Sequence, residues 1–185
     1  MIITSGKFKG KKVIAPNAEI TRPTLSQVRM SVFNILQSVL EFKESSFLDM
    51  FAGSGIMGLE ALSRGFRFVT AIEKNSKVMN ILKSNYQNVV KDNTTYRLRL
   101  ADSLRAVSKL NEKFDVIYID PPYFSGIYEK SLDAIKNIAG NVVILEHVTD
   151  VDFSEFELLK QKRYGNKYLT VLKINHSEAS AEESN

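Results

Sequence analysis

A short turn, Asp120-Pro121-Pro122-Tyr123, carries the residue types best suited to chemistry in this sequence. It follows residues 114–119, a run of β-branched and aromatic residues typical of a buried strand. The prolines lack an N–H and fix φ at about −65°, so the turn is stiff and its carbonyls lack local donors. The carboxylate and these carbonyls could accept hydrogen bonds from an exocyclic amine, and the tyrosine offers a flat face to a base. A rigid turn with one solvated carboxylate explains the tetrapeptide alone equally well.

A glycine-rich turn lies in the first half of the chain. A predicted strand that contains Asp49 runs into Gly53 and Gly55, and a predicted helix follows. Glycines let a backbone approach a ligand closely, and a helix N-terminus favours negative charge. No Lys-Ser/Thr pair follows the second glycine, which excludes a phosphate-binding P-loop. Gly53-x-Gly55-x-x-Gly58 matches only the bare dinucleotide pattern, and Asp49 before it favours S-adenosylmethionine over NAD.

Acids follow successive predicted strands. Glu73 ends a strand at residues 68–72, about 20 residues past the glycine turn, where nucleotide-binding sheets hold a ribose. Asp102 follows the next strand and could accept the amine of an adenine. Any one of these acids alone would more often be a solvated strand-end carboxylate. Because the carboxyl ends of parallel strands meet at one rim, we expect both to converge there with Asp49 and Asp120.

The elements that must position these residues alternate along the chain. Strands and helices alternate from residue 46 to about residue 140, which predicts right-handed βαβ crossovers and a parallel sheet. Residues 141–146 are predicted to form a fifth strand. Residues 24–40 are predicted to form an amphipathic helix with a core-facing stripe that starts at Leu25 and ends at Val39.

These motifs together resemble Rossmann-like S-adenosylmethionine-dependent methyltransferases. The chain is more narrowly similar to the RsmD-type family, which methylates the N2 amine of one guanine in small-subunit (16S) ribosomal RNA. The narrower similarity covers nearly the whole chain, and Asp-Pro-Pro-Tyr itself is shared with many amino-methyltransferases. The residues that carry the resemblance are 3–10, Arg22-Pro23-Thr24, Val28-Arg29, Asp49 to Gly55, Leu59 to Gly65, Asp120 to Tyr123 and Tyr164-Gly165-Asn166.

The resemblance implies a fold and a site. The fold is a Rossmann-like α/β domain with a mostly parallel seven-stranded sheet, an antiparallel C-terminal strand and a short basic N-terminal extension. Residues 156–162 and 167–174 then form a terminal antiparallel pair. The implied catalytic residues are Asp120, Pro121, Pro122 and Tyr123. The implied contacts of S-adenosyl-L-methionine are Asp49, Phe51, Ala52, Gly53, Ser54, Gly55, Glu73, Lys74, Asp102 and Ser103.

Positive charge gathers near the N-terminus. The chain has 25 Lys and Arg against 21 Asp and Glu, for a net charge of +4. A solvated basic face is the ordinary explanation of such a cluster. Beside an amine-binding turn, a surface for RNA phosphates is the better interpretation. The residues expected to meet substrate RNA are Lys7, Lys9, Lys11, Lys12, Arg22, Thr24 and Arg29.

Length and composition fit one domain, because 185 residues of which 44% are hydrophobic can bury a sizeable core. We expect a methyltransferase domain at residues 1–174, made of a basic extension and helix at 1–41 and a catalytic core at 46–174. A disordered acidic tail is expected at 175–185. No apolar run reaches the length of a membrane span and no signal-peptide core is present, so we expect a cytoplasmic protein.

The chain has no cysteine, which excludes disulfides, cysteine-based zinc sites and covalent attack by a thiolate. His147 and His176 do not form a ligand cluster, so no metal is expected. The expected partner of this monomer is ribosomal RNA, either free or within a small-subunit assembly intermediate. Two alternatives remain open. One is methylation of adenine N6 in DNA or RNA, or of a protein glutamine, and the other is an RNA-binding protein that keeps the cofactor fold without activity.

Overall fold

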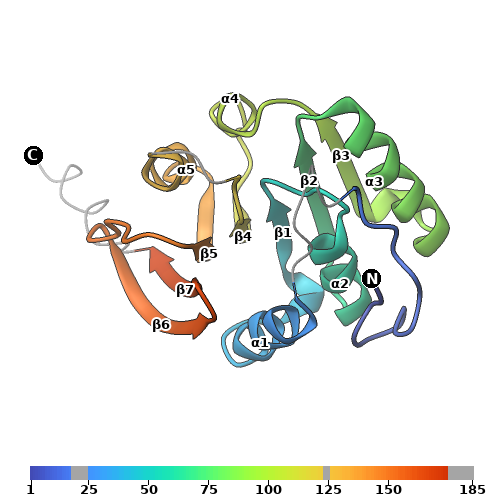
Figure 1. The fold of residues 1–185 in the computed structure, drawn as a ribbon, viewed down its shortest axis with the longest axis horizontal. Coiled ribbons are helices and arrows are strands. Elements are labelled where there is room, and N and C mark those ends of the chain that lie inside the picture. The colour runs from blue at the N-terminus through green and yellow to red at the C-terminus, as the bar shows by residue number, and fades with distance from the viewer. Residues whose placement is uncertain (18–24, 123–125, 175–185) are drawn as a thin grey trace, which may run out of the picture.

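The computed structural model describes residues 1–17, 25–122 and 126–174, and seven strands within them form one sheet. The strand order is β3-β2-β1-β4-β5-β7-β6 (Figure 1). The strands are β1 (Ser46–Asp49), β2 (Phe68–Glu73), β3 (Tyr96–Leu100), β4 (Phe114–Ile119), β5 (Ala139–His147), β6 (Phe156–Tyr164) and β7 (Lys167–Ile174). The helices are α1 (Ser26–Gln37), α2 (Ile56–Arg64), α3 (Ser76–Val89), α4 (Ser103–Val107) and α5 (Ile127–Ile135), with 3-10 turns at Phe42–Glu44 and Asn93–Thr95.

The sheet is parallel from β3 through β5, and β7 runs antiparallel between β5 and β6. This topology confirms the predicted mostly parallel Rossmann-like α/β sheet with an antiparallel strand at its C-terminal end. All four residues of β1 are buried, as are five of the six residues of β4. Burial on both faces explains why these central strands are continuous apolar runs rather than alternating patterns.

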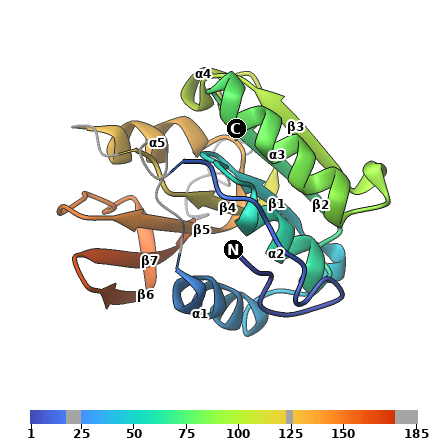
Figure 2. The ribbon, with the colours of Figure 1, turned by 45° about the vertical axis from the view of Figure 1, so that its right-hand side comes forward.

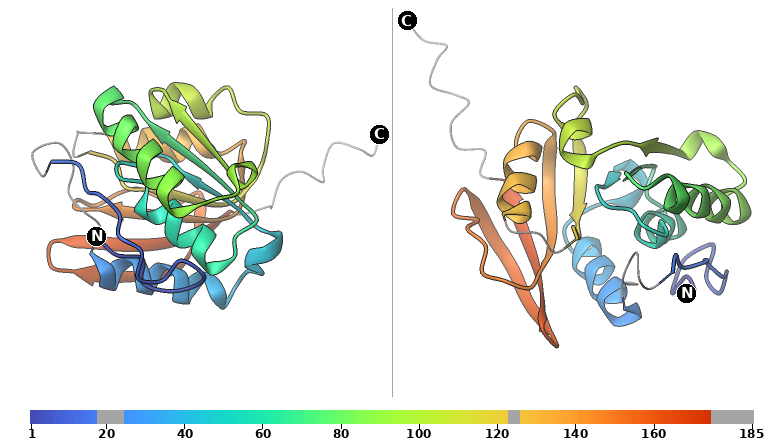
Figure 3. Two further views of the ribbon diagram at one scale, coloured as in Figure 1. Left: turned by 90° about the vertical axis from the view of Figure 1, so that its right-hand side faces the viewer. Right: turned by 45° about the horizontal axis from the view of Figure 1, so that its top comes forward.

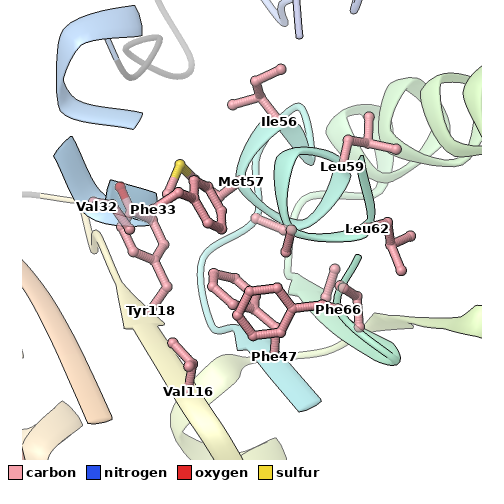
Figure 4. Packing of buried hydrophobic residues seen from close by; sticks show 14 of the residues in the cluster. Val32, Phe33, Phe47, Ile56, Met57, Leu59, Leu62, Phe66, Val116 and Tyr118 are labelled. Atoms are coloured by element: carbon pink, nitrogen blue, oxygen red, sulfur yellow. The ribbon is translucent and has the colours of Figure 1, made fainter. Parts of the chain in front are cut away.

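Helices cover both faces of the sheet (Figure 2). On one face α1, α2 and α3 enclose an aromatic core, where the Phe33 ring stacks 6.0 Å from Phe47 and meets Phe66 edge-on at 6.2 Å (Figure 4). On the other face α4 and α5 bury a second core that contains Ile117 of β4 and Leu132 of α5. The two cores hold the strands in fixed register, and this fixes where their carboxyl ends lie.

The observed elements differ from the predicted ones mainly at their ends. Helix α1 is shorter than the predicted 24–40 helix, and Leu25 and Val39 are 64% and 45% exposed. Both residues lie outside the helical turns, so the helical period no longer directs their side chains to the core. The predicted tail at 175–185 lies outside the described residues. Among those that are described, no helix is long and apolar enough to cross a bilayer.

The basic N-terminal extension, residues 1–17, packs against α2 and α3 (Figure 2). The Lys7 amide donates to the Ser63 carbonyl at 2.8 Å, near the end of α2. Gly6 has a φ of +81°, and a Cβ there would lie 1.9 Å from the Ser63 oxygen. Only glycine therefore permits this close approach of the extension to the helix.

A buried ionic network joins the extension to the helices. Glu60 of α2 is fully buried, and its carboxylate accepts bonds from Arg29 Nε at 3.2 Å and Arg64 Nε at 3.4 Å. The same carboxylate accepts the Thr4 amide at 2.7 Å and the Thr4 hydroxyl at 3.0 Å. The Arg29 guanidinium also donates to the Ile2 carbonyl at 2.9 Å. Glu60 thus connects α1, α2 and the extension.

Replacing Glu60 with glutamine should destabilise the fold by about 2 kcal/mol, because buried arginines lose the charge that compensates them. Glu112→Gln is the matched control, since Glu112 pairs with Arg97 at 2.5 Å on the surface and its loss should cost about 0.5 kcal/mol or less. Urea unfolding of both variants measures the difference. Equal midpoints for the two variants would show that the buried network does not stabilise the fold.

Candidate active site

The glycine turn leaves β1 at the carboxyl rim of the sheet. Its backbone is tied to the neighbouring strands, because the Met50 amide donates to Tyr118 and the Ala52 amide donates to Ile72. Gly53 and Gly55 have φ values of +54° and +80°, in the left-handed region that favours glycine. The turn therefore presents backbone rather than side chains at the start of α2.

Glu73, at the end of β2, holds the glycine turn in place through hydrogen bonds to backbone amides. One carboxylate oxygen accepts the Gly53 amide at 3.0 Å and the other accepts the Asn75 amide at 2.7 Å. Each oxygen has a second lone pair that can accept a ligand hydroxyl. Glu73, the acid predicted to bind a ribose, therefore lies in contact with the predicted glycine turn.

The start of α4 lies beside the same turn. The buried Ser103 hydroxyl donates to the Met50 carbonyl, so this helix is anchored to the loop after β1. Asp102 is exposed and caps α4 by accepting the Arg105 amide at 3.1 Å. The carboxylate therefore stands at the rim with one oxygen engaged by the helix.

Asp120 directly follows β4 and belongs to a cluster of charged and hydroxyl groups that we call the rim cluster: Asp120, Tyr118, Glu146 and Lys167. Lys167 Nζ lies 3.2 Å from Asp120 Oδ1 and 3.0 Å from Glu146 Oε2. The Tyr118 hydroxyl donates to the other oxygen of Glu146. Glu146 is buried, whereas the Asp120 side chain keeps 17% of its surface exposed. Asp120 is thus the carboxylate of this cluster that an incoming group can reach.

Burial and neighbouring charge raise the pKa values of two rim acids. The pKa of Asp120 rises to about 7, first through burial and then through Glu146, while the Lys167 ammonium lowers it. The pKa of Asp49 rises to about 8 through burial and the charges of Asp120 and Glu73. Neither Asp49 oxygen has a hydrogen-bond partner of ordinary geometry among the described residues, although nearby backbone amides lower its pKa in part. Such perturbed carboxyls are typical of ligand sites.

The remaining predicted site residues lie near the glycine turn, after Asp120 or outside the described residues. Ala52 and Ser54 are buried in the glycine turn, Phe51 is half-buried there, and Lys74 is exposed beside Glu73. Pro121 is buried and Pro122 is exposed after Asp120. Tyr123, Arg22 and Thr24 lie outside the described residues.

Sequence reasoning missed Glu146 and Lys167. Glu146 had the same signal as the predicted acids, because it ends the predicted strand at 141–146. Lys167 had no local signal. It reaches Asp120 only because β7 returns antiparallel beside β5, which places its first residue at the carboxyl rim.

Those residues predicted to bind RNA that the structure describes lie away from the rim cluster. Lys7, Lys9, Lys11 and Lys12 are exposed, and Lys11 Nζ donates to the Val89 carbonyl at 2.9 Å. Lys7 lies at the C-terminal end of α2 and Lys11 at that of α3, whereas the glycine turn lies at the N-terminal end of α2. Arg29 differs from the expectation, because it is 3% exposed and paired with Glu60. We therefore assign Arg29 a structural role.

The fold and the residues at the rim are those of a Rossmann-like methyltransferase. The comparisons with known proteins agree with this class. A family model described as "Conserved hypothetical protein 95" matches residues 1–173, and the chain belongs to this family, the RsmD family. The "Ribosomal RNA small subunit methyltransferase D" of Buchnera aphidicola subsp. Acyrthosiphon pisum is 36% identical over 73% of this chain and 69% of its own. The protein of the same name from Haemophilus influenzae is 33% identical over 72% of this chain and 69% of its own. The solved Escherichia coli protein yhhF, 23% identical, superposes with a TM-score of 0.83 over 95% of this chain and 98% of its own, which supports the fold.

Proposed function

We propose that this protein methylates the exocyclic N2 amine of a guanine in 16S ribosomal RNA, with S-adenosylmethionine as the methyl donor. The observation that carries the proposal is the position of Asp120. Its partly exposed carboxylate lies directly after β4, at the rim that also holds the glycine turn and Glu73. The family membership and the names of the ribosomal RNA methyltransferases that resemble this chain support the substrate class.

The residues at the glycine turn fit the proposed cofactor. Glu73 retains acceptor capacity for ribose hydroxyls, and the exposed Asp102 can accept an adenine amine. Asp49 is buried under the turn without an ordinary hydrogen-bond partner among the described residues, and a nearby cation would favour its ionised form. When bound, S-adenosylmethionine supplies a methyl group that its sulfonium already activates.

The chemistry assigned to the chain itself centres on Asp120. The lone pair of a guanine N2 amine is delocalised into the ring, which makes the amine a poor nucleophile. A carboxylate that accepts an N–H bond from this amine favours a pyramidal nitrogen and stabilises the positive charge that develops on it. The Pro121 carbonyl can accept the second N–H. With a pKa of about 7, Asp120 is matched to take the proton that the methylated amine then loses.

The proposed substrate must bring one base out of its stack to reach a rim carboxylate, which costs least in a loop or a partly assembled RNA. The exposed Lys7, Lys9, Lys11 and Lys12 would bind phosphates distant from that base. Because bacterial 16S ribosomal RNA is assembled into subunits in the cytoplasm, we propose that location for the protein.

The proposal is tested by offering the purified protein three substrates with a radiolabelled methyl donor: total RNA from a strain that lacks the enzyme, DNA and a protein extract. We expect label in RNA alone. Label in DNA or in protein would assign the protein to one of the rival substrate classes. No label in any fraction, with cofactor binding intact, would indicate a binding protein without activity.

Replacing Glu73 with glutamine should weaken S-adenosylmethionine binding by about 10-fold, since a charged acceptor of ribose hydroxyls is lost. Glutamine keeps the side-chain volume and one acceptor oxygen, which can still receive the Gly53 amide, while the Asn75 amide loses its acceptor. Calorimetry measures the affinity, with the surface variant Glu112→Gln as the control. An unchanged affinity would show that Glu73 only organises the Gly53 loop.

A further inference from the structure

A strongly basic strand pair adjoins the rim cluster, and neither the glycine turn nor the N-terminal extension accounts for it. The pair, residues 156–174, forms the outer edge of the sheet (Figure 3). It contains a single acid, Glu157. Its basic residues are Lys160, Lys162, Arg163, Lys167 and Lys173. We call this segment the basic hairpin.

We propose that the basic hairpin binds the phosphates of the single-stranded RNA that flanks the target nucleotide, through Lys160, Lys162 and Arg163. This inference rests on the proposed function. The basic hairpin would be a second RNA-binding surface, beside the site. It differs from the surface of the N-terminal lysines in its position and in the expected effect of its loss.

The sheet register places the basic hairpin beside the candidate catalytic acid. Glu146, Leu169 and Lys162 lie in one row across β5, β7 and β6. Neighbouring strands are about 4.8 Å apart, so the Lys162 backbone stands about 10 Å from that of Glu146. Paired residues point to the same face of a sheet, so Lys162 is on the face of Glu146. The Lys162 ammonium lies 3.3 Å from the Ser31 hydroxyl of α1, consistent with that face.

The strand that carries these charges is open to solvent on both faces. Residues 157–163 of β6 are all exposed, although β6 is part of the sheet. Lys160 pairs with Val171 of β7. Because Lys160 is two residues before Lys162 on the same strand, both side chains lie on the same face of the sheet. The two lysines therefore form a row on the exposed edge, at a spacing of about 7 Å.

The opposite face of the basic hairpin offers a stacking surface at the rim. The Tyr168 ring stacks on His147 at 5.3 Å, and the exposed Arg163 guanidinium lies 5.6 Å from the Tyr168 ring centre. The Arg163 Nε donates to the Gly165 carbonyl at 2.9 Å, which holds the guanidinium in place. A guanidinium plane held in this way can stack with an unpaired base or bind a phosphate.

Edge strands also carry lysines merely to prevent pairing with other chains. The two explanations predict different results for the double variant Lys160→Gln, Lys162→Gln, which keeps side-chain length and removes two charges. The matched control is Lys109→Gln, Lys113→Gln, an exposed pair near the amino end of β4. Lys9→Gln, Lys12→Gln tests the N-terminal surface in parallel.

Binding of a labelled single-stranded oligoribonucleotide is measured for each variant across a range of salt, together with methyl transfer to 16S RNA. The hairpin variant should bind RNA more weakly by roughly 10-fold at 0.1 M salt, and its slope of log K against log salt should flatten by about 1.4, or 0.7 per contact. The KM for RNA should rise while kcat at saturating RNA and cofactor affinity stay unchanged.

Hairpin and control variants that bind RNA equally, while the wild-type protein methylates RNA, would overturn the hairpin assignment and leave the proposed function standing. Increased aggregation of the hairpin variant with unchanged RNA affinity would do the same, in favour of edge protection. A wild-type protein that transfers no methyl group to RNA would overturn the proposed function, and the hairpin assignment with it.

Discussion

Replacing Asp120 with alanine should lower the single-turnover rate of methyl transfer by about 10²–10³-fold, the range for losing one preorganised group that stabilises a transition state. The effect belongs to the chemical step, because Asp120 lies in the rim cluster rather than on the glycine turn. The affinity for S-adenosylmethionine should therefore change little. Rapid-quench kinetics under saturating cofactor and RNA measure the rate.

Unfolding of the Asp120→Ala variant serves as the control on stability. Burial raises the pKa of Asp120 to about 7, above the ordinary carboxyl value. A carboxyl whose pKa is raised by folding contributes stability at low pH and loses it as the pH rises through the folded value. At neutral pH its removal should therefore cost little stability. Near-normal turnover by the folded variant would show that Asp120 is not the acceptor of the amine.

Replacing Lys167 with methionine should move the acid limb of the pH–rate profile upward by about 1 pH unit or more. In the proposed mechanism Asp120 accepts the amine as a carboxylate, so the wild-type rate should fall as the pH falls through about 7. Lys167 Nζ is 3.2 Å from Asp120 and 3.0 Å from Glu146. Without this ammonium two neighbouring carboxyls cannot both ionise readily, and the pKa of Asp120 rises further.

The expected loss of rate for Lys167→Met is about 10-fold or more at pH 6 and should shrink toward pH 9. The other charged or titratable groups near Asp120 are Asp49, Tyr118 and Glu146, and none of them is changed. Lys167→Arg keeps the charge and should keep the wild-type profile. A loss of rate that is equal at all pH values would indicate a purely structural role for Lys167.

The sequence predicts the parallel part of this fold well, because the evidence for it is local. Buried strands such as β4 are short apolar runs, and the acids that end them mark the carboxyl rim. Glu73 could be predicted to lie at the glycine turn, since the rule that joins strand ends to ligands depends only on topology.

The parts that depend on tertiary packing could not be predicted in the same way. Arg29 belongs to a cluster of positive charge in the sequence, yet its guanidinium is buried against Glu60, which is 31 residues away. Lys167 is 47 residues from Asp120 and meets it through the antiparallel return of β7. Charge counting treats such residues as surface charges, because it contains no information about which helix or strand will cover them.

The central claim is that a guanine N2 amine is the methyl acceptor, and nucleoside analysis of the methylated RNA tests it most directly. Small-subunit RNA from a strain lacking the enzyme is incubated with the purified protein and labelled S-adenosylmethionine, digested to nucleosides and separated by liquid chromatography with mass spectrometry. We expect the label in N2-methylguanosine, and about 10²–10³-fold less of it per unit time with the Asp120→Ala protein. Label in N6-methyladenosine would contradict the proposed base specificity.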